Sequence, residues 1–434
     1  MNKDKYTFID LFAGCGGLSL GMNQAGFKCV WAVEIDENAS ETYRHNLGNH
    51  LVTSDVRDVD VADVPDCDVL VGGFPCQPFS ISGLQAGFDG KDGDLFYQCV
   101  RFINAKRPKV FMLENVSGFA TLQKGYFLNT AISILSSLGY HVSWQILDCS
   151  DYSIPQTRKR ILILGNRIGR ENIYPTPTNK KISVKEAIDD IWQNPDRYLN
   201  NEPMRHSPRI VERFSYVEQG ETALDAMRKH PELGNAKITK QCYRRMIETE
   251  PAPTVVANFV ITTIHYSKNR NLTAREAARL QTFPDTFEFK GYKTRMSWQK
   301  SLSQFEQIGN AVPPELARLM GNCIKDILEE NTPAFVIEQS LFPELSCQIN
   351  FGDIPVIPMR PQQARGKSHS NRGRNSKYSK IYEDIERLIP GESTFIPDEV
   401  PEDFFVFLPG AMSRRGIRYE VKREGASRRI VRLP

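Results

Sequence analysis

The sequence lacks long hydrophobic runs, and no apolar stretch approaches the length of a membrane span. It has nine cysteines, an odd number, without a Cys-x-x-Cys pair, and its first residues show no signal-peptide pattern. These features favour a reduced, cytoplasmic compartment over a disulfide-stabilised secreted protein. The seven histidines show no metal-ligand spacing, so we expect no metal site. The formal net charge of +3 is too small to indicate a nucleic-acid partner by itself.

The chain is long enough for two or three domains, with 434 residues of which 40% are hydrophobic. Alternating strand and helix patterns run to about Asn166 and predict an α/β fold with a doubly wound, mostly parallel sheet. The prolines around Tyr174 then begin a polar, irregular region that continues to about Arg270. Helical periodicity returns near residue 272 and again over 316–328.

A Pro-Cys dipeptide follows one of the predicted strands. Residues 67–71 are short, apolar and β-branched with glycine at the end, which is typical of a buried parallel strand. Cys76 lies in the loop beyond, where open α/β sheets bind their ligands. Most free cysteines are small buried hydrophobic residues, but a thiolate on a rigid turn at this edge is a candidate nucleophile.

A glycine-rich turn, Gly-x-Gly-Gly over 14–17, follows the first predicted strand and leads into a helical pattern. Such a turn predicts a backbone cradle for a nucleotide-like cofactor. A second strand ends in Glu34, where a carboxylate can accept from two ribose hydroxyls, and a third is followed by Asp55. The turn lacks the third glycine of the dinucleotide fingerprint, so these residues alone leave a nicotinamide dinucleotide and another nucleotide-like cofactor equally open.

Charged residues lie at the ends of two further strands. The apolar run 110–113 continues directly into Glu114, which places this carboxylate at the same sheet edge as Cys76. Arg158 and Arg160 immediately precede the strand 161–164. Each feature alone is common on solvated surfaces, but together they describe one pocket.

In this order, the motifs resemble those of the DNA cytosine-5 methyltransferase family. Six motifs carry the resemblance over about residues 6–325: Phe12-Ala13-Gly14-Cys15-Gly16 for the cofactor, Pro75-Cys76-Gln77 for the nucleophile, Glu114-Asn115-Val116 for proton handling, Gln156-x-Arg158-x-Arg160, Arg275 to Pro284, and Gly309-Asn310-Ala311-Val312.

The resemblance implies methyl transfer from S-adenosylmethionine to carbon 5 of a flipped-out cytosine in a specific double-stranded DNA sequence, through a covalent adduct. The implied catalytic residues are Cys76, Glu114, Arg158 and Arg160. The implied cofactor-binding residues are Phe12, Gly14, Gly16, Gly17, Leu18, Glu34, Ile35, Asp55, Val56, Pro75, Asn310 and Val312. The implied DNA contacts are Ser80, Ser82, Thr254, Val255 and Arg275.

The implied setting is a bacterial or phage restriction-modification system, in which a cytoplasmic monomer protects DNA from a cognate restriction endonuclease. Two other functions are weighed against it: an RNA cytosine-5 methyltransferase of the transfer-RNA type, and a catalytically idle DNA-binding repressor. The long region before the Arg275 motif favours DNA over RNA. The presence of Cys76, Glu114 and Arg160 argues against a repressor.

The same patterns divide the chain into four parts. They are a catalytic and cofactor-binding domain over 1–175, completed by a helix over 304–330; a target-recognition domain and return segment over 176–303; a linker over 331–380; and a small C-terminal α+β module over 381–434. The module is predicted as a helix over 382–388 and a hairpin around 424–427, with DNA binding and a structural or docking role equally open. A lid is predicted over 80–94.

Overall fold

The computed structural model describes residues 6–75, 93–233, 243–258, 262–294, 298–335, 393–396, 419–424 and 427–432. Contacts divide the chain into two compact units, Met1–Cys347 and Gln348–Pro434. Cys76, Ser80 and Ser82, most of the predicted lid, and the predicted helix over 382–388 lie outside the described residues.

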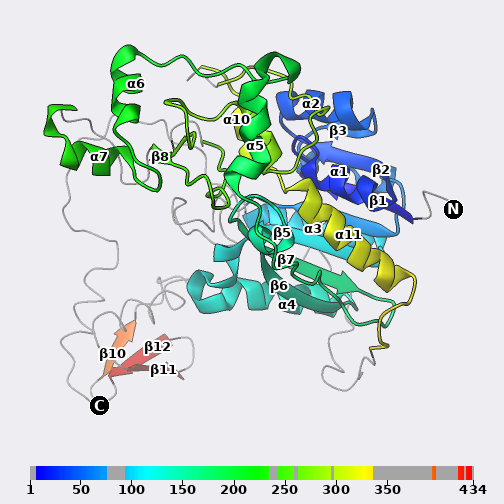
Figure 1. Ribbon diagram of the computed structural model, residues 1–434. Helices are drawn as coiled ribbons and strands as arrows, with labels where there is room; N and C mark the ends of the chain where they lie inside the picture. The colour runs from blue at the N-terminus through cyan, green and yellow to red at the C-terminus, as the bar shows by residue number, and fades with distance from the viewer. Residues whose placement is uncertain are drawn as a thin grey trace. The chain divides into compact units, whose positions relative to one another are not determined.

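A seven-stranded, mostly parallel sheet forms the centre of the first unit (Figure 1). Its order is β3-β2-β1-β4-β5-β7-β6, and β7 runs antiparallel to both of its neighbours. The order reverses between β1 and β4, which is the switch point where doubly wound sheets bind ligands. The predicted α/β class is confirmed. The strands are β1 Tyr6–Leu11, β2 Phe27–Glu34, β3 Leu51–Thr53, β4 Val69–Gly73, β5 Val110–Val116, β6 His141–Asp148 and β7 Lys159–Asn166.

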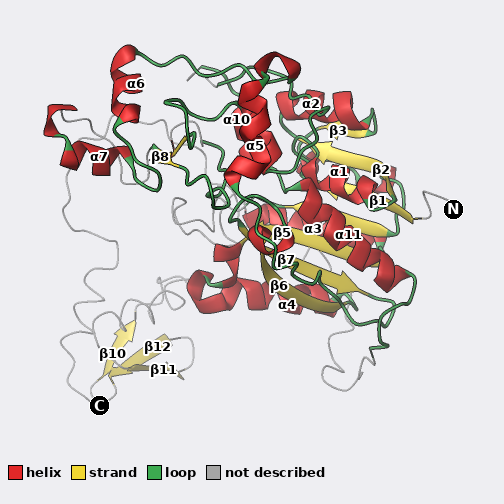
Figure 2. Ribbon diagram, in the orientation of Figure 1, coloured by secondary structure: helices red, strands yellow, loops and turns green. Residues whose placement is uncertain are grey.

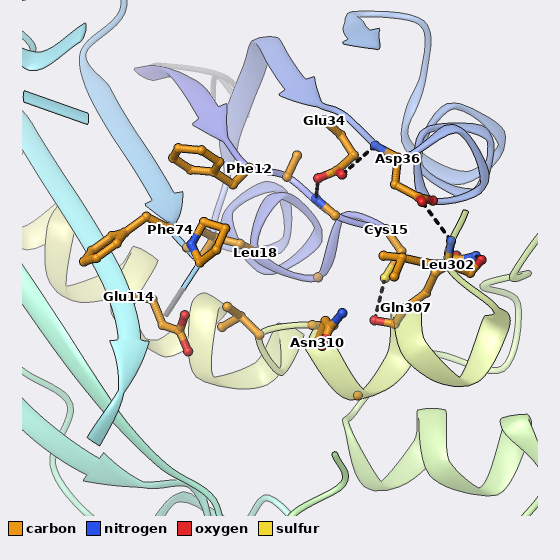
Figure 3. Close-up of a pocket in the computed structure, with 18 of the residues that line it drawn as sticks. Phe12, Cys15, Leu18, Glu34, Asp36, Phe74, Glu114, Leu302, Gln307 and Asn310 are labelled. Carbon is orange, nitrogen blue, oxygen red and sulfur yellow. Dashed lines mark hydrogen bonds between the residues drawn. The ribbon is translucent and has the colours of Figure 1, made fainter. Parts of the chain in front are cut away.

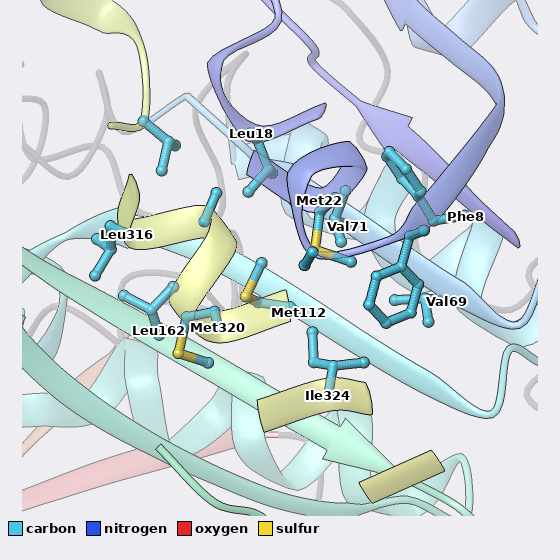
Figure 4. Packing of buried hydrophobic residues seen from close by; sticks show 14 of the residues in the cluster. Phe8, Leu18, Met22, Val69, Val71, Met112, Leu162, Leu316, Met320 and Ile324 are labelled. Atoms are coloured by element: carbon cyan, nitrogen blue, oxygen red, sulfur yellow. The ribbon is translucent and has the colours of Figure 1, made fainter. Parts of the chain in front are cut away.

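Helices cover both faces of this sheet (Figure 2). Successive strand residues point to opposite faces, so Val69 and Val71 join one buried cluster while Leu70 joins the other. The first cluster contains Met22 and Met320 from two helices, as Figure 4 shows. The helices of this layered core are α1 Gly17–Gln24, α2 Glu37–Leu47, α3 Gly93–Lys106, α4 Tyr126–Ser137 and α11 Pro314–Leu328.

The helix predicted over 304–330 is two helices, so that prediction is wrong in detail. The first, α10, covers Gln304–Asn310, and α11 begins at Pro314. Pro313 and Pro314 have no N–H to continue the hydrogen bonds of α10, and the chain turns between the two helices.

Between β7 and α10, the residues that the structure describes form short helices and little sheet. Three of the helices begin with a reciprocal capping box: Ser183 with Glu186, Thr222 with Asp225, and Thr273 with Glu276. The elements are α5 Val184–Gln193, α6 Pro208–Ser215, α7 Ala223–Lys229, β8 Arg244–Arg245, β9 Thr263–Ile264 and α9 Ala274–Leu280. Short 3₁₀ turns are η1 Val56–Asp58, η2 Val61–Asp63, η5 Ser117–Ala120, η6 Leu122–Gly125, η7 Cys149–Tyr152, η8 Pro195–Arg197 and η9 Pro231–Leu233.

The second unit contains an antiparallel sheet in the order β10-β12-β11. The predicted hairpin is confirmed, because β11 (Tyr419–Glu424) pairs with β12 (Ser427–Arg432) around the expected turn. A third strand, β10 (Ser393–Ile396), pairs with β12 and was not predicted. Among the described helices of the whole chain, none is both long and apolar enough to cross a membrane.

Candidate active site

A cavity of about 480 Å³ lies at the carboxyl ends of β1, β2, β4 and β5 (Figure 3). This is the sheet edge predicted from the strand ends. The cavity is lined by Phe12, Ala13, Gly14, Cys15, Gly17, Leu18, Glu34, Ile35, Asp36, Gly73, Phe74, Pro75, Glu114, Asn115, Val116, Arg158, Arg160, Leu302, Gln307, Gly309, Asn310, Ala311 and Val312.

The glycine turn and Glu34 form one side of the cavity. The Gly14 N–H donates to Oε2 of Glu34 at 2.8 Å, and the Asp36 N–H donates to Oε1 at 2.8 Å. Burial raises the pKa of the Glu34 carboxyl. Gly14 has a φ of +55°, and no atom lies within 4 Å of the position a Cβ would take. The backbone of this turn is therefore open to a ligand.

The other two glycines of the turn have packing roles. A Cβ on Gly16 would lie 2.4 Å from a methyl group of Leu47, so this glycine allows α2 to approach and does not line the cavity. A Cβ on Gly17 would lie 2.3 Å from the carbonyl oxygen of Val312. Gly17 thus lets the start of α1 contact the opposite wall directly.

That opposite wall is residues 302–312, which we call the return wall. Asp36 accepts from Ala39 N at the start of α2, while its Oδ2 accepts from Leu302 N at 2.7 Å. Gln307 accepts from the Thr42 hydroxyl at 2.6 Å. The sequence analysis missed both Asp36 and Gln307. The available signals were an aspartate before a helix and a glutamine two residues before the motif that contains Asn310.

Glu114 and Arg160 form an ion pair inside the cavity. The Arg160 Nε lies 2.7 Å from Glu114 Oε1, and both side chains are almost buried. Gly73 faces Glu114 across β4 and β5, and a Cβ there would lie 3.2 Å from Oε2. Asn115 donates to the carbonyl oxygen of Phe74 at 3.2 Å, which fixes the loop start after β4. Pro75 also lines the cavity, and Cys76 follows it in the chain.

Arg158 lines the cavity, but its guanidinium is engaged by the backbone. It donates to the carbonyl oxygen of Val255 at 2.7 Å and to those of Gly309 and Ala311 at 3.1 Å each. The side chain is 1% exposed, and burial lowers its pKa to about 9. The sequence predicts Arg158 as a catalytic residue, whereas in the structure its guanidinium anchors three carbonyl groups.

Five other residues predicted as contacts lie outside the cavity. Arg275 is fully buried and donates to the carbonyls of Leu199, Pro284 and Phe287, so its prediction as a DNA contact is wrong. The Val255 side chain is buried beside α5 and α9, and the half-buried Thr254 hydroxyl donates to Thr157 O. Asp55 pairs with Arg57 and Val56 packs in the core, so neither lines the cavity.

The sheet order and the cavity at its switch point define the class as a doubly wound α/β fold of the Rossmann-like type. Residues 6–326 match the family of C-5 cytosine-specific DNA methylases. The chain belongs to this family and is a DNA cytosine-5 methyltransferase, as the resemblance predicted.

Relatives of similar size support the assignment. The chain is 35% identical to the type II methyltransferase M.NgoFVII of Neisseria gonorrhoeae, over 79% of this chain and 92% of the relative. It is 37% identical to the type II methyltransferase M.DdeI of Desulfomicrobium norvegicum, over 73% and 88% respectively. The Entamoeba histolytica methyltransferase EhMeth shares the fold, with a TM-score of 0.54, 17% identity, and coverage of 74% of this chain and 98% of that one.

Proposed function

We propose that the protein transfers a methyl group from S-adenosylmethionine to carbon 5 of a flipped-out cytosine in a specific double-stranded DNA sequence. The reaction proceeds through a covalent adduct of Cys76, and the methylated DNA is protected from a cognate restriction endonuclease. The observation that carries this proposal is the Glu114–Arg160 pair, held in one cavity beside the loop that leads to Cys76.

The residues of the cavity fit this cofactor. The volume of about 480 Å³ is within the usual range for a small-molecule site. The open backbone of Gly14 suits close approach, and Phe12, Leu18 and Ile35 offer apolar surface. Each carboxylate oxygen of Glu34 accepts one N–H and keeps a second lone pair for a ribose hydroxyl. When bound, S-adenosylmethionine supplies the methyl group.

The chemistry explains why a thiolate and a carboxyl group are needed together. Carbon 5 of cytosine is a poor nucleophile until the Cys76 thiolate adds to carbon 6 and breaks the aromaticity of the ring. Electron density then accumulates at ring nitrogen 3, where Glu114 shares a proton. Arg160 holds the Glu114 carboxyl group in place through its Nε–H. After methylation, loss of the carbon 5 proton expels Cys76, and the ring becomes aromatic again.

A cytosine stacked in a duplex is out of reach of these groups, so the proposal requires base flipping. We propose the region 176–303 as the target-recognition domain. Its described part has a small core of its own, formed by Phe214, Val217, Ala223, Ala226 and Ile264. This core can hold a recognition surface that varies independently of the cavity.

Bisulfite sequencing of genomic DNA treated with the protein and the cofactor tests the proposal, and we expect one methylated sequence context. Cys76→Ala should abolish methylation, and duplexes with 5-fluorocytosine at the site should trap the wild-type protein covalently. The matched control is Cys67→Ala, because Cys67 precedes β4 and does not line the cavity. A normal rate in Cys76→Ala, or no trapped adduct, would contradict the mechanism. Methylation of RNA alone, or site-specific DNA binding without methylation, would favour the two rival functions.

A further inference from the structure

The segment 252–255 lies against the residues that lead into β7. It includes Thr254, the one predicted DNA contact in the described residues whose side chain is partly exposed. The hydrogen bonds that join the two segments include Ala252 N to Pro155 O at 3.0 Å, Thr157 N to Ala252 O at 2.8 Å, and the Thr254 hydroxyl to Thr157 O at 2.7 Å. The chain continues from this contact directly to Arg160, so the segment is linked to the catalytic pair.

Both backbone groups of Val255 are held by buried side chains. Its N–H donates to Oε1 of Gln156 at 3.1 Å, and its carbonyl oxygen accepts from Nη1 of Arg158 at 2.7 Å. Gln156 and Arg158 are 0% and 1% exposed. Leaving such groups unpaired away from water is costly, so we expect the Val255 backbone and the two side chains to move together.

Arg158 also reaches the return wall of the cavity directly, and Gln156 is connected to it through Gln281. We call Gln156, Arg158 and Gln281 the junction. Its contacts with the wall are Arg158 Nη2 to Gly309 O and Ala311 O at 3.1 Å each, and Gln281 Nε2 to Ile308 O at 2.7 Å, while Gln156 donates to Gln281 Oε1 at 2.6 Å. One connected set of buried hydrogen bonds therefore runs from Val255 to the cavity wall.

Gly309 brings the two backbones into direct contact. A Cβ at this position would lie 2.3 Å from the backbone nitrogen of Ala257 and from the carbonyl carbon of Val256. No side chain fits there unless the backbone moves. The return wall and the segment after Val255 consequently share a backbone contact in addition to the hydrogen bonds of the junction.

We propose that the junction couples DNA binding to cofactor binding, with Arg158 as its central positioning residue. The inference rests on the proposed function, with Thr254 of segment 252–255 as an implied DNA contact and Asn310 and Val312 of the return wall as implied cofactor contacts. When DNA binds and fixes segment 252–255, the junction also fixes Ile308 to Ala311. The return wall is then already ordered when the cofactor binds. A lysine cannot replace Arg158, because the forked guanidinium donates to three carbonyl groups at once and a single ammonium group does not span them.

The test measures the dissociation constant of S-adenosylhomocysteine by calorimetry, with and without a duplex that carries the site found by bisulfite sequencing. In the wild type, we expect the duplex to tighten binding by about 5- to 150-fold. We call the ratio of the dissociation constants without and with the duplex the coupling factor. In Arg158→Lys, the coupling factor should fall to within about twofold of one. Gln281→Met keeps the arginine and removes the wall contact of the glutamine, and it should reduce the factor at least about threefold. This second variant decides the question if Arg158→Lys does not fold.

The matched control is Arg275→Lys. Arg275 is equally buried and also donates to three backbone carbonyls, but none of their residues lines the cavity. It should lose stability as Arg158→Lys does and keep the wild-type coupling factor. An unchanged factor in both junction variants, or an equal loss in Arg275→Lys, would overturn the inference. A wild type that methylates DNA but shows no coupling overturns this inference alone, whereas one that does not methylate DNA overturns the proposed function as well.

Discussion

At the scale of single residues, the site depends on a carboxyl group and a guanidinium that come from neighbouring antiparallel strands. Val116 of β5 pairs with Arg160 of β7, which places the arginine beside Glu114. The absence of a side chain at Gly73 leaves room for the carboxyl group. The arrangement gives Glu114 one fixed orientation toward the cavity.

Glu114→Gln keeps the shape of the side chain and removes the acid. We expect the single-turnover methylation rate to fall by about a hundred- to ten-thousand-fold, which is the usual worth of general acid–base catalysis. The affinity for S-adenosylhomocysteine should remain within about twofold of the wild type. Rapid-quench kinetics measures the rate, and a mutant within about threefold of the wild type would exclude Glu114 from proton sharing.

Asp10 is a second buried carboxyl, located on β1 just before the glycine turn. Its Oδ2 accepts from the Ser19 hydroxyl at 2.6 Å, while Oδ1 has no partner among the described residues. Burial, with a smaller contribution from the charge of Glu34, raises the pKa of Asp10 to about 7. Asp10 thus keeps a proton in the folded protein that the unfolded chain releases from about pH 4 upward.

The consequence is a loss of stability as the pH rises through this window. The unfolded state binds fewer protons there, so the free energy of unfolding decreases, by about 2–3 kcal/mol between about pH 5 and about pH 8. Asp10→Asn does not titrate, and its stability relative to the wild type should increase by that amount over the same range. Urea unfolding of both proteins at the two pH values measures the difference in their free energies of unfolding. If this difference does not change with pH, Asp10 is charged in the folded state.

At the scale of elements, α1 and α11 approach each other closely because Gly21 has no side chain. A Cβ on Gly21 would lie 2.2 Å from the carbonyl oxygen of Pro314 and 2.4 Å from Cβ of Ala317. We expect Gly21→Ala to lower the free energy of unfolding by at least about 1–3 kcal/mol, as overpacking does. Gly118→Ala is the control, since no atom lies within 4 Å of its Cβ position. Urea denaturation should show that control unchanged or stabilised by up to about 1 kcal/mol, and equal effects would contradict the packing argument.

Strands were predictable where both faces are buried. The residues of β4 and β5 form continuous apolar runs because helices cover the sheet on both sides. The edge strand β6 is largely half-buried or exposed and has no such run, so its pattern did not identify it. Glu34 and Glu114 were predictable as cavity residues because each lies at the end of a parallel strand.

The roles of the arginines were not predictable in the same way. A motif marks Arg158 and Arg275 as important, but their partners are carbonyl groups that lie far away in the sequence, such as those of Gly309 and Leu199. Sequence order does not reveal whether a guanidinium binds DNA or a backbone carbonyl. Only the fold brings these segments together.

At the scale of the whole molecule, the family match ends at residue 326, and the first compact unit ends at Cys347. We expect a chain that ends after Cys347 to fold and to methylate the same site as the full chain. Circular dichroism and bisulfite sequencing measure the two properties. If the slope of log DNA affinity against log salt concentration is smaller for the truncated chain than for the full chain, the second unit makes phosphate contacts. Each such contact contributes about 0.9 to the slope. Loss of folding or a changed site would show that the second unit belongs to the catalytic machinery.

The cofactor cavity is completed late in translation, because its return wall comes late in the sequence. The ribosome makes the glycine turn and Glu34 early, but Gln307 and Asn310, which complete the cavity, are translated only after the region 176–303. A nascent chain therefore has no complete cofactor cavity until its whole recognition region has been translated. A chain whose translation stops within that region lacks one side of the cavity. Such a truncated chain therefore cannot methylate DNA at sites that the recognition region has not selected.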